Sequence, residues 1–368
     1  MNYNEFRRRS RAVRVGRADV TPTVIGGDAP VCVQTMLSTP TDDKARCLEQ
    51  AKRLAAAGAQ IIRVTVPSPD NACIFDYLHS AGISVPLVAD IHFDYRAALE
   101  SVAAGADKIR INPGNIGDDS RVKAVADACR SAGVPIRIGV NGGSLERGIL
   151  EKYGAPTSEA LCDSALYHAS LLERYDFSDI VISVKSSDVR TTIGAYRILA
   201  DRTDYPLHLG VTEAGTKMRG TVKNAVGIGS LLCDGIGDTI RISLTSDPED
   251  EVREGIRLLD LLGMRECGIE LISCPTCGRT RVDLISLAEE FERRAAAGSP
   301  GRRMKVAIMG CAVNGPGEAR DADFGVACGD GCGVLFSGGE TVGRVGEDRI
   351  IDTLLYMCEH GGELPEQR

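Results

Sequence analysis

The chain has 368 residues, 43% of them hydrophobic, which is enough for one large domain and one smaller one, each with its own core. Its formal net charge of −8 repels phosphate backbones, which argues against general binding to nucleic acids or anionic membranes. No apolar run reaches membrane-spanning length, and no apolar stretch follows the basic N-terminal residues as it does in a signal peptide, so we expect a cytoplasmic protein.

Short apolar segments rich in β-branched residues recur eight times over roughly 230 residues, about the length of a closed barrel. They begin at residues 31, 60, 86, 108, 135, 179, 206 and 238. Ala- and Leu-rich stretches with charges at helical spacing lie between them, for example 44–59 and 120–134. This alternation predicts an α/β fold, a (β/α)8 barrel of the TIM type. A doubly wound open sheet is the alternative, and it is disfavoured because no G-x-G-x-x-G motif opens the first helix.

The segment after the eighth strand ends the barrel. It predicts a last helix with Asp247 as N-cap, Pro248 in the first turn and Gly263 as the stop. Beyond it, strands and one helix are expected at 267–273, 282–298, 304–310, 324–328 and 333–338, which together form a small α/β domain. We therefore divide the chain into a barrel domain, 1–265, and a second domain, 266–368.

The carboxyl ends of the eight strands carry polar side chains within an otherwise apolar pattern. In a barrel these ends form one mouth, where such folds place their active sites. The side chains are Arg63, Asp90, Arg110, Asn112, Arg137, Asn141, Lys185, Thr212, Glu213, Arg241 and Ser243. Five of them are cations, and guanidinium groups offer paired donors to anionic oxygens, so we expect a ligand with more than one phosphate. The alternative is that these arginines pair with acids of the surrounding helices.

Three of these residues have further interpretations. Glu213, a carboxylate among cations, is placed to donate or accept a proton or to bind a substrate hydroxyl. Lys185 also fits a Schiff-base nucleophile, because barrel aldolases carry a lysine on the sixth strand. Asp90, which precedes His92 in the sequence DIH, is also typical of a structural hydrogen-bonding pair.

The thirteen cysteines are odd in number and scattered, which does not fit the disulfide framework of a small secreted domain. Cys274, Cys277 and Cys311 stand apart, because C-x-x-C followed by a third cysteine in a reducing compartment predicts zinc or an iron–sulfur cluster. The candidates for a fourth ligand are Cys267, Glu318, Cys328 and Cys332. A Gly- and Pro-rich turn after Cys311 can bring Glu318 back to the same metal, where a carboxylate is exchangeable. That suits a cluster at which substrate binds, whereas a fourth cysteine completes a zinc site.

Several long motifs, in this order, closely resemble those of the bacterial hydroxymethylbutenyl diphosphate synthases, iron–sulfur enzymes of the methylerythritol phosphate route to isoprenoids. The motifs are KIRINPGNIG, GVNGGSLE, VISVKSSD, GIGDTIRISLT, CPTCGRT and MGCAVNGPGEA. The resemblance implies reductive ring opening and dehydration of 2-C-methyl-D-erythritol 2,4-cyclodiphosphate to 4-hydroxy-3-methylbut-2-enyl diphosphate. It also implies that flavodoxin or ferredoxin supplies the electrons.

The resemblance further implies the cofactor and the roles of the site residues. It implies a [4Fe–4S] cluster held by Cys274, Cys277, Cys311 and Glu318, in which the carboxylate holds the fourth iron until a substrate oxygen displaces it. Substrate contacts fall on Arg63, Arg110, Asn112, Arg137, Asn141, Lys185, Thr212, Arg241 and Ser243. Glu213 falls on the acidic catalytic residue of the family.

A head-to-tail homodimer is also implied, because the last barrel helix returns the chain to the face opposite the mouth. In the resembled family, one subunit's cluster domain covers the barrel of the other. Cys328 and Cys332 depart from the family pattern.

The residues alone leave two other classes open. One is a zinc-stabilised barrel aldolase or synthase that uses Lys185. The other is a non-catalytic iron–sulfur sensor, which the ring of cations disfavours because a scaffold has no use for an anion-binding mouth.

Overall fold

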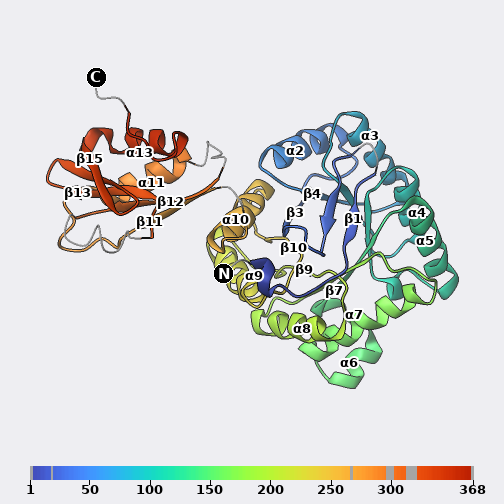
Figure 1. Ribbon diagram of the computed structural model, residues 1–368. Coiled ribbons are helices and arrows are strands. Elements are labelled where there is room, and N and C mark those ends of the chain that lie inside the picture. Colours follow the sequence, from blue (N-terminus) through green and yellow to red (C-terminus); the bar gives the residue numbers. More distant parts are fainter. Residues whose placement is uncertain (1–2, 18–19, 266–267, 296–301, 312–320, 366–368) are drawn as a thin grey trace. The chain divides into compact units, whose positions relative to one another are not determined.

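The computed structural model describes all residues except 1–2, 18–19, 266–267, 296–301, 312–320 and 366–368 (Figure 1). Contacts within the chain divide it into two compact units, Met1–Met264 and Arg265–Arg368. Each unit has a hydrophobic core of its own.

The first unit is a parallel barrel of eight strands, as the sequence predicts. The strands are β3 (Cys32–Met36), β4 (Ile61–Thr65), β5 (Leu87–Asp90), β6 (Lys108–Ile111), β7 (Ile136–Asn141), β8 (Ile180–Lys185), β9 (His208–Leu209) and β10 (Thr239–Ile240). Neighbouring strands pair in the order β8-β7-β6-β5-β4-β3-β10-β9. A parallel bridge between Ile182 and Leu207 joins β8 to β9, so the barrel is nearly closed.

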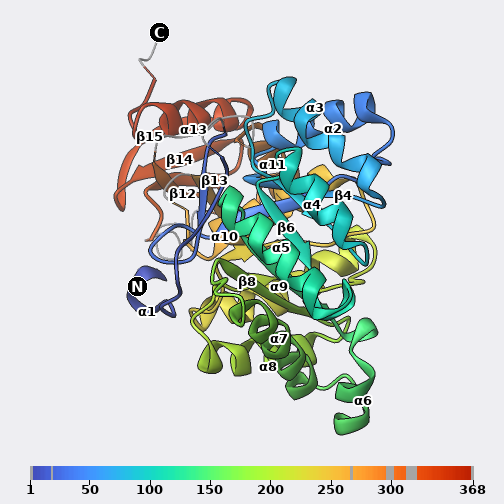
Figure 2. The same cartoon turned by 90° about the vertical axis from the view of Figure 1, so that its right-hand side faces the viewer.

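Helices surround these strands, as Figure 1 shows, and α4 lies beside α5 in Figure 2. They are α2 (Lys44–Ala56), α3 (Ile74–Ser80), α4 (Tyr95–Ala103), α5 (Asp119–Ala132), α6 (Arg147–Tyr153), α7 (Ser158–Glu173), α8 (Val189–Arg202), α9 (Lys217–Cys233) and α10 (Pro248–Leu261). The predicted last helix is confirmed, since the Asp247 side chain accepts a hydrogen bond from the Glu249 N–H at its start. No helix in the described part of the chain is both long and apolar enough to cross a membrane.

Side chains alternate along each strand between the helices and the barrel interior. On β4, Ile62 and Val64 belong to the large core between strands and helices, while Ile61 faces inward. This outer core explains why the strands read as almost continuous apolar runs.

A hairpin that the sequence analysis did not predict fills the amino-terminal end of the barrel. Its strands, β1 (Val13–Val15) and β2 (Thr23–Ile25), pair antiparallel. Val13, Val15 and Ile25 cluster with residues near the starts of the barrel strands, Cys32, Ile61, Val88 and Val181. Because this end is apolar and filled, most polar inward-facing side chains lie nearer the carboxyl ends, and Lys108 at the start of β6 is an exception.

The second unit is a five-stranded sheet with helices on one face. Its strands, in spatial order, are β11 (Gly268–Ser273), β12 (Arg303–Met309), β13 (Phe324–Gly329), β14 (Cys332–Ser337) and β15 (Glu340–Gly346). The first three are parallel, and β13 and β14 form the hairpin that the sequence predicts. Val306 and Ile308 of β12 pack with α11 (Leu284–Ala295) and α13 (Ile350–Glu359), while Ala307 and Met309 belong to a second cluster. Neither β15 nor α13 was predicted.

Asp238 ties the N-terminal segment to the barrel, and its loss should destabilise the first unit. The carboxylate is buried and accepts hydrogen bonds from Arg7 Nη2, Ser10 Oγ and Leu207 N, each at 2.7 Å. We expect Asp238→Ala to lower the free energy of unfolding by about 3–5 kcal/mol in urea titrations, because a buried guanidinium loses its carboxylate. Asp204→Ala is the control, since Asp204 pairs with Arg11 at the surface and contributes below about 1 kcal/mol. Equal losses in the two variants would contradict this account.

Candidate active site

The strand-end residues singled out from the sequence converge on the barrel interior. Asp90, Arg110 and Arg137 lie in register on β5, β6 and β7, and Asn141 lies in register with Lys185 on β8. Side chains in register on neighbouring strands face the same side of a sheet. Four of these five side chains are almost fully buried, and Asn141 is partly exposed.

Asp90 is a carboxylate held between two arginines. One oxygen lies 3.6 Å from Nε of Arg63, and the other lies 3.2 Å from Nη1 of Arg110. Burial alone would raise its pKa, but the two guanidinium groups hold the pKa of Asp90 at about 2. The carboxylate therefore stays ionised and fixes the direction of both arginines, a geometry that supports a positioning role.

Arg241 pairs with a helix acid, the alternative that the sequence analysis kept open. Glu251 of α10 accepts hydrogen bonds from Nε and Nη2 of Arg241 at 3.2–3.3 Å, and the Thr35 hydroxyl donates to the same carboxylate. Sequence reasoning missed Glu251, because an acid in the first turn of a helix is also typical of dipole compensation.

Two other cations have no carboxylate partner among the described residues. Arg137 donates from Nη1 to the Ser183 hydroxyl at 2.6 Å, while its Nε and Nη2 lack a partner. Lys185 Nζ lies 3.3 Å from Nε2 of His208, a buried residue that the sequence analysis did not identify. Burial, followed by repulsion from neighbouring cations, lowers the pKa of Arg137 and of Lys185 well below their ordinary values.

The interior carries an excess of positive charge. Among the described residues, the carboxylates that pair with its cations are Asp90 and, from helix α10, Glu251. Its basic side chains are Arg63, Lys108, Arg110, Arg137, Lys185 and Arg241. Inward-facing polar atoms of Gln34, His208 and Thr239 also lack hydrogen-bond partners. Buried donors without partners and uncompensated cations together make an anion-binding site.

Glu213 follows β9 in a strained conformation. Its φ of 52° lies in the left-handed region, which non-glycine residues occupy at a cost of about 1 kcal/mol and which is concentrated at functional sites. The side chain is exposed, and no described residue hydrogen-bonds or pairs with its carboxylate. It is therefore free to exchange protons or bind a ligand hydroxyl.

The remaining predicted polar residues lie at neighbouring strand ends. Asn112 Oδ1 accepts a hydrogen bond from the Gly139 N–H at 2.9 Å. This bond uses the amide oxygen and does not occupy the side-chain N–H donors. Thr212 and Ser243 are partly exposed, at positions following β9 and β10.

Two glycines make room for the cations. A Cβ atom on Gly139 would lie 2.3 Å from Nε of Arg110, and one on Gly210 would lie 2.7 Å from Nζ of Lys185. The motif GVNGG contains the first of these positions, but the sequence does not show which side chain crosses it.

The cysteine site lies at the carboxyl edge of the second unit's parallel strands. Cys274 directly follows β11, and Cys311 comes two residues after β12, so both lie at the same edge. The Gly310 N–H donates to Cys274 Sγ at 3.4 Å, and the Arg281 N–H donates to the Gly310 carbonyl at 3.0 Å. These bonds hold the C-x-x-C loop against the end of β12.

The thiols fit the donor set of an iron–sulfur cluster. Hydrogen bonding from the Arg279 backbone lowers the pKa of exposed Cys277, and N–H donation to sulfur, as at Cys274, is typical of cluster ligands. No three His, Cys, Asp or Glu side chains in the described ranges are already placed to hold a metal ion. Two candidates for a fourth ligand, Cys267 and Glu318, lie outside the described residues.

The extra cysteines of the second unit differ in environment. Cys328 is fully buried among the apolar residues of the core, and burial raises its pKa to about 12, which is typical of a packing cysteine. Cys332, on β14, is half-buried.

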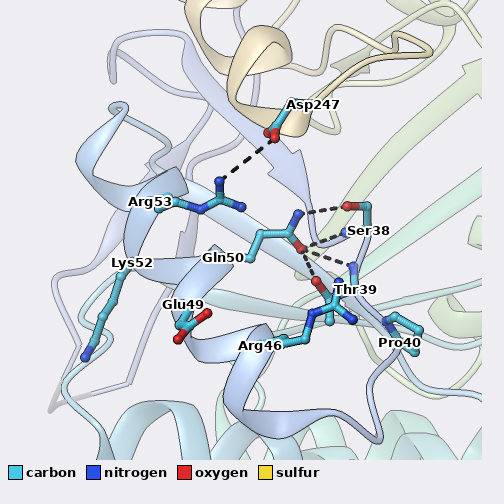
Figure 3. Close-up of a pocket in the computed structure, with 9 residues that line it drawn as sticks. All are labelled: Ser38, Thr39, Pro40, Arg46, Glu49, Gln50, Lys52, Arg53 and Asp247. Atoms are coloured by element: carbon cyan, nitrogen blue, oxygen red, sulfur yellow. Dashed lines mark hydrogen bonds and ion pairs between the residues drawn. The ribbon is translucent and has the colours of Figure 1, made fainter.

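A separate pocket lies outside the barrel, between α2 and the start of α10 (Figure 3). Gln50 fills its centre, accepting hydrogen bonds from the Ser38 and Thr39 N–H groups and donating to Ser38 Oγ. Nη1 of Arg53 lies 4.0 Å from Oδ2 of Asp247 on the other side of the pocket. Acidic and basic side chains are mixed here, and Gln50 already has hydrogen-bond partners. This pocket therefore lacks the excess of positive charge found in the barrel interior.

Fold and site together define a class of protein: a TIM barrel with an anion-binding interior, followed by an α/β domain with a thiol-rich edge. The chain matches the GcpE TIM-barrel domain over residues 10–256 and the GcpE protein C-terminal domain over residues 270–360. It belongs to the GcpE family.

Two curated relatives with high sequence identity share the same enzyme name. The chain is 52% identical to the 4-hydroxy-3-methylbut-2-en-1-yl diphosphate synthase (flavodoxin) of Clostridium perfringens, covering 96% of this chain and 99% of the relative. It is 51% identical to the enzyme of the same name from Symbiobacterium thermophilum, covering 96% and 93%. A type I 3-dehydroquinate dehydratase from Clostridium difficile shares the fold alone, with a TM-score of 0.51 and 14% identity over 69% of this chain and 98% of that one.

Gly139→Ala should weaken anion binding through Arg110. The added Cβ displaces the guanidinium, so we expect the Kd for inorganic pyrophosphate to rise at least about tenfold, or about 1.4 kcal/mol, in calorimetric titrations. Gly148→Ala on α6 is the matched control, because a Cβ there meets nothing within 4 Å. The same affinity in both variants would show that Arg110 does not contact the ligand.

Proposed function

We propose that this chain catalyses the reductive ring opening and dehydration of 2-C-methyl-D-erythritol 2,4-cyclodiphosphate to 4-hydroxy-3-methylbut-2-enyl diphosphate, in isoprenoid biosynthesis. The observation that carries the proposal is the uncompensated positive charge inside the barrel, which matches a ligand with two phosphoryl groups. The relatives are named for this reaction and its flavodoxin donor. Family membership supports this reaction and does not support the zinc-dependent aldolase.

The barrel residues bind and orient the cyclic diphosphate. Arg63, Arg110 and Arg137 face its phosphoryl oxygens with their free N–H donors, while Asp90 and Glu251 hold the arginines that they pair with. The remaining contacts come from Asn112, Asn141, Lys185, Thr212, Arg241 and Ser243. When both phosphoryl groups are held in place, only the ring carbon and its C–O bond need to rearrange during the reaction. Holding them in advance lowers the entropic part of the activation barrier.

Glu213 handles protons at the reacting end of the substrate. With the substrate as a dianion and the product as a trianion, the overall reaction takes up two electrons and one proton and releases one water. A free carboxylate on a strained backbone is positioned to deliver this proton to the departing oxygen.

The second domain holds an iron–sulfur cluster, which we propose to be [4Fe–4S]. Cys274, Cys277 and Cys311 supply three thiolates, and Glu318 is the proposed fourth ligand. When bound, the cluster supplies the two electrons that the reaction needs, received from flavodoxin, with ferredoxin as the alternative donor. Such a cluster requires reduced thiols, and all of the described cysteines are free, which supports a cytoplasmic location.

Metal and sulfide analysis of anaerobically purified protein tests this function. We expect about four irons and four acid-labile sulfides per chain, and a paramagnetic resonance signal after reduction that changes when the cyclodiphosphate is added. Arg110→Ala should keep the iron and sulfide but lose the change, whereas Arg147→Ala, at an exposed ion pair on α6, should behave as wild type. Zinc without sulfide would overturn the proposal and return Lys185 to the role of a nucleophile.

The active form is proposed to be a head-to-tail homodimer. Helix α10 follows β10 and runs antiparallel to it, as helices of this fold do, so the chain leaves the barrel at the end opposite the mouth. Sedimentation analysis should therefore give twice the mass of one chain. A monomer with full turnover would contradict the dimer.

A further inference from the structure

Lys108 is a buried base inside the barrel that the proposed reaction does not use. It lies on β6 two residues before Arg110, so the two side chains share the inward face of the strand. The side chain is fully buried, and Nζ has no hydrogen-bond partner among the described residues. It lies one inward-facing layer deeper than Arg110, further from the carboxyl ends of the strands.

The groups that face Lys108 from the other strands do not neutralise it. They are Cys32 on β3, Arg63 on β4, Arg137 on β7 and His208 on β9. Burial raises the pKa of Cys32 and lowers that of His208, so the first stays a thiol and the second a neutral ring. The interior carboxylates are already paired, Asp90 with Arg63 and Arg110, and Glu251 with Arg241.

An ammonium group in this position is repelled without compensation. Burial, followed by the charge of Arg137, lowers the pKa of Lys108 to about 7. Near pH 8 the uncharged amine is therefore the stable form in the empty barrel.

We propose that Lys108 lies beneath the anion site and accepts a proton when the ligand binds. Its side chain is a neutral amine while the barrel is empty and becomes an ammonium once a doubly charged cyclic diphosphate binds nearer the carboxyl ends of the strands. This inference rests on the proposed function. The bound anion reverses the sign of the local field, which favours the charged form of the lysine. Ring opening breaks one C–O bond of the cyclic diphosphate and leaves a terminal phosphate with additional negative charge, which the ammonium stabilises as well.

Calorimetry with the cyclodiphosphate measures the proton directly. Each phosphate of this ligand carries one ester and one anhydride linkage, and its single acidic group ionises far below pH 7, so any proton taken up near pH 8 goes to the protein. Titrations of anaerobic holoenzyme without reductant, in HEPES and in Tris, give the number of protons from the dependence of the enthalpy on the buffer. We expect about one proton per ligand at pH 8 and close to none at pH 6.

The pH dependence of affinity provides a second measurement, on the unaltered protein. Because the lysine must be charged before or during binding, the Kd should rise about 20-fold from pH 6.5 to pH 8.5. Lys108→Met should take up no proton, and its Kd should stay within about twofold over this range. Its melting temperature should be no lower than that of wild type, because a buried amine without a partner is removed. Lys123→Met, at an exposed lysine paired with Asp127 on α5, should retain the wild-type behaviour.

Each outcome decides the assignment. Binding without proton uptake, or a flat pH dependence in wild type, would overturn the role of Lys108 and leave the proposed function intact. Uptake that persists in Lys108→Met would also overturn it and assign the proton to Lys185 and His208. Failure of the cyclodiphosphate to bind at all would overturn the proposed function together with this inference.

Discussion

Positive charge buried without compensation inside a closed barrel is the constraint on which the rest of the first unit depends. An unpaired buried cation destabilises a protein by several kcal/mol, so the structure must be stabilised elsewhere. That stability comes from the apolar core between strands and helices and from the hairpin that fills the amino-terminal end. The two carboxylates that pair with barrel arginines, Asp90 and Glu251, orient those arginines more than they neutralise the interior, since Arg137 and Lys185 are left without an acid among the described residues. In the proposed function, a bound anionic substrate completes the electrostatic balance.

Backbone positions set the precision of this site as much as the charged side chains do. Gly139 and Gly210 lie where any Cβ would collide with a cation, so their absence of a side chain decides which way Arg110 and Lys185 extend. Glu213 keeps a left-handed backbone despite its cost, and its side chain is exposed, whereas the ion pairs of the interior are buried. Placing the cations at strand ends, with the proposed catalytic acid on the loop after β9, combines a rigid binding surface with an exposed carboxylate.

Periodicity predicted the eight barrel strands and the last helix because each obeys a local rule, an apolar run or a cap at Asp247. The N-terminal hairpin was missed because its strands have three residues each and are stabilised by the barrel more than by their own pattern. The strand-end cations were recognisable because charges are rare in buried strands. Sequence reasoning did not recognise Glu251, His208 and Lys108. The role of an acid in a first helical turn, or of a base within a strand, depends on neighbours that are distant in sequence. Long-range contacts of this kind cannot be inferred from spacing.

The two chemistries of this chain make opposite demands on their surroundings, which explains why they occupy units with separate cores. Anion binding is strongest in a closed interior with little water, where each cation keeps its full field. Thiolates that receive a metal need the reverse, an accessible edge with backbone N–H donors, as Cys277 and Cys274 have. Because the two cores share no residue, a substitution inside the barrel removes no core contact of the unit that carries the cysteine pair.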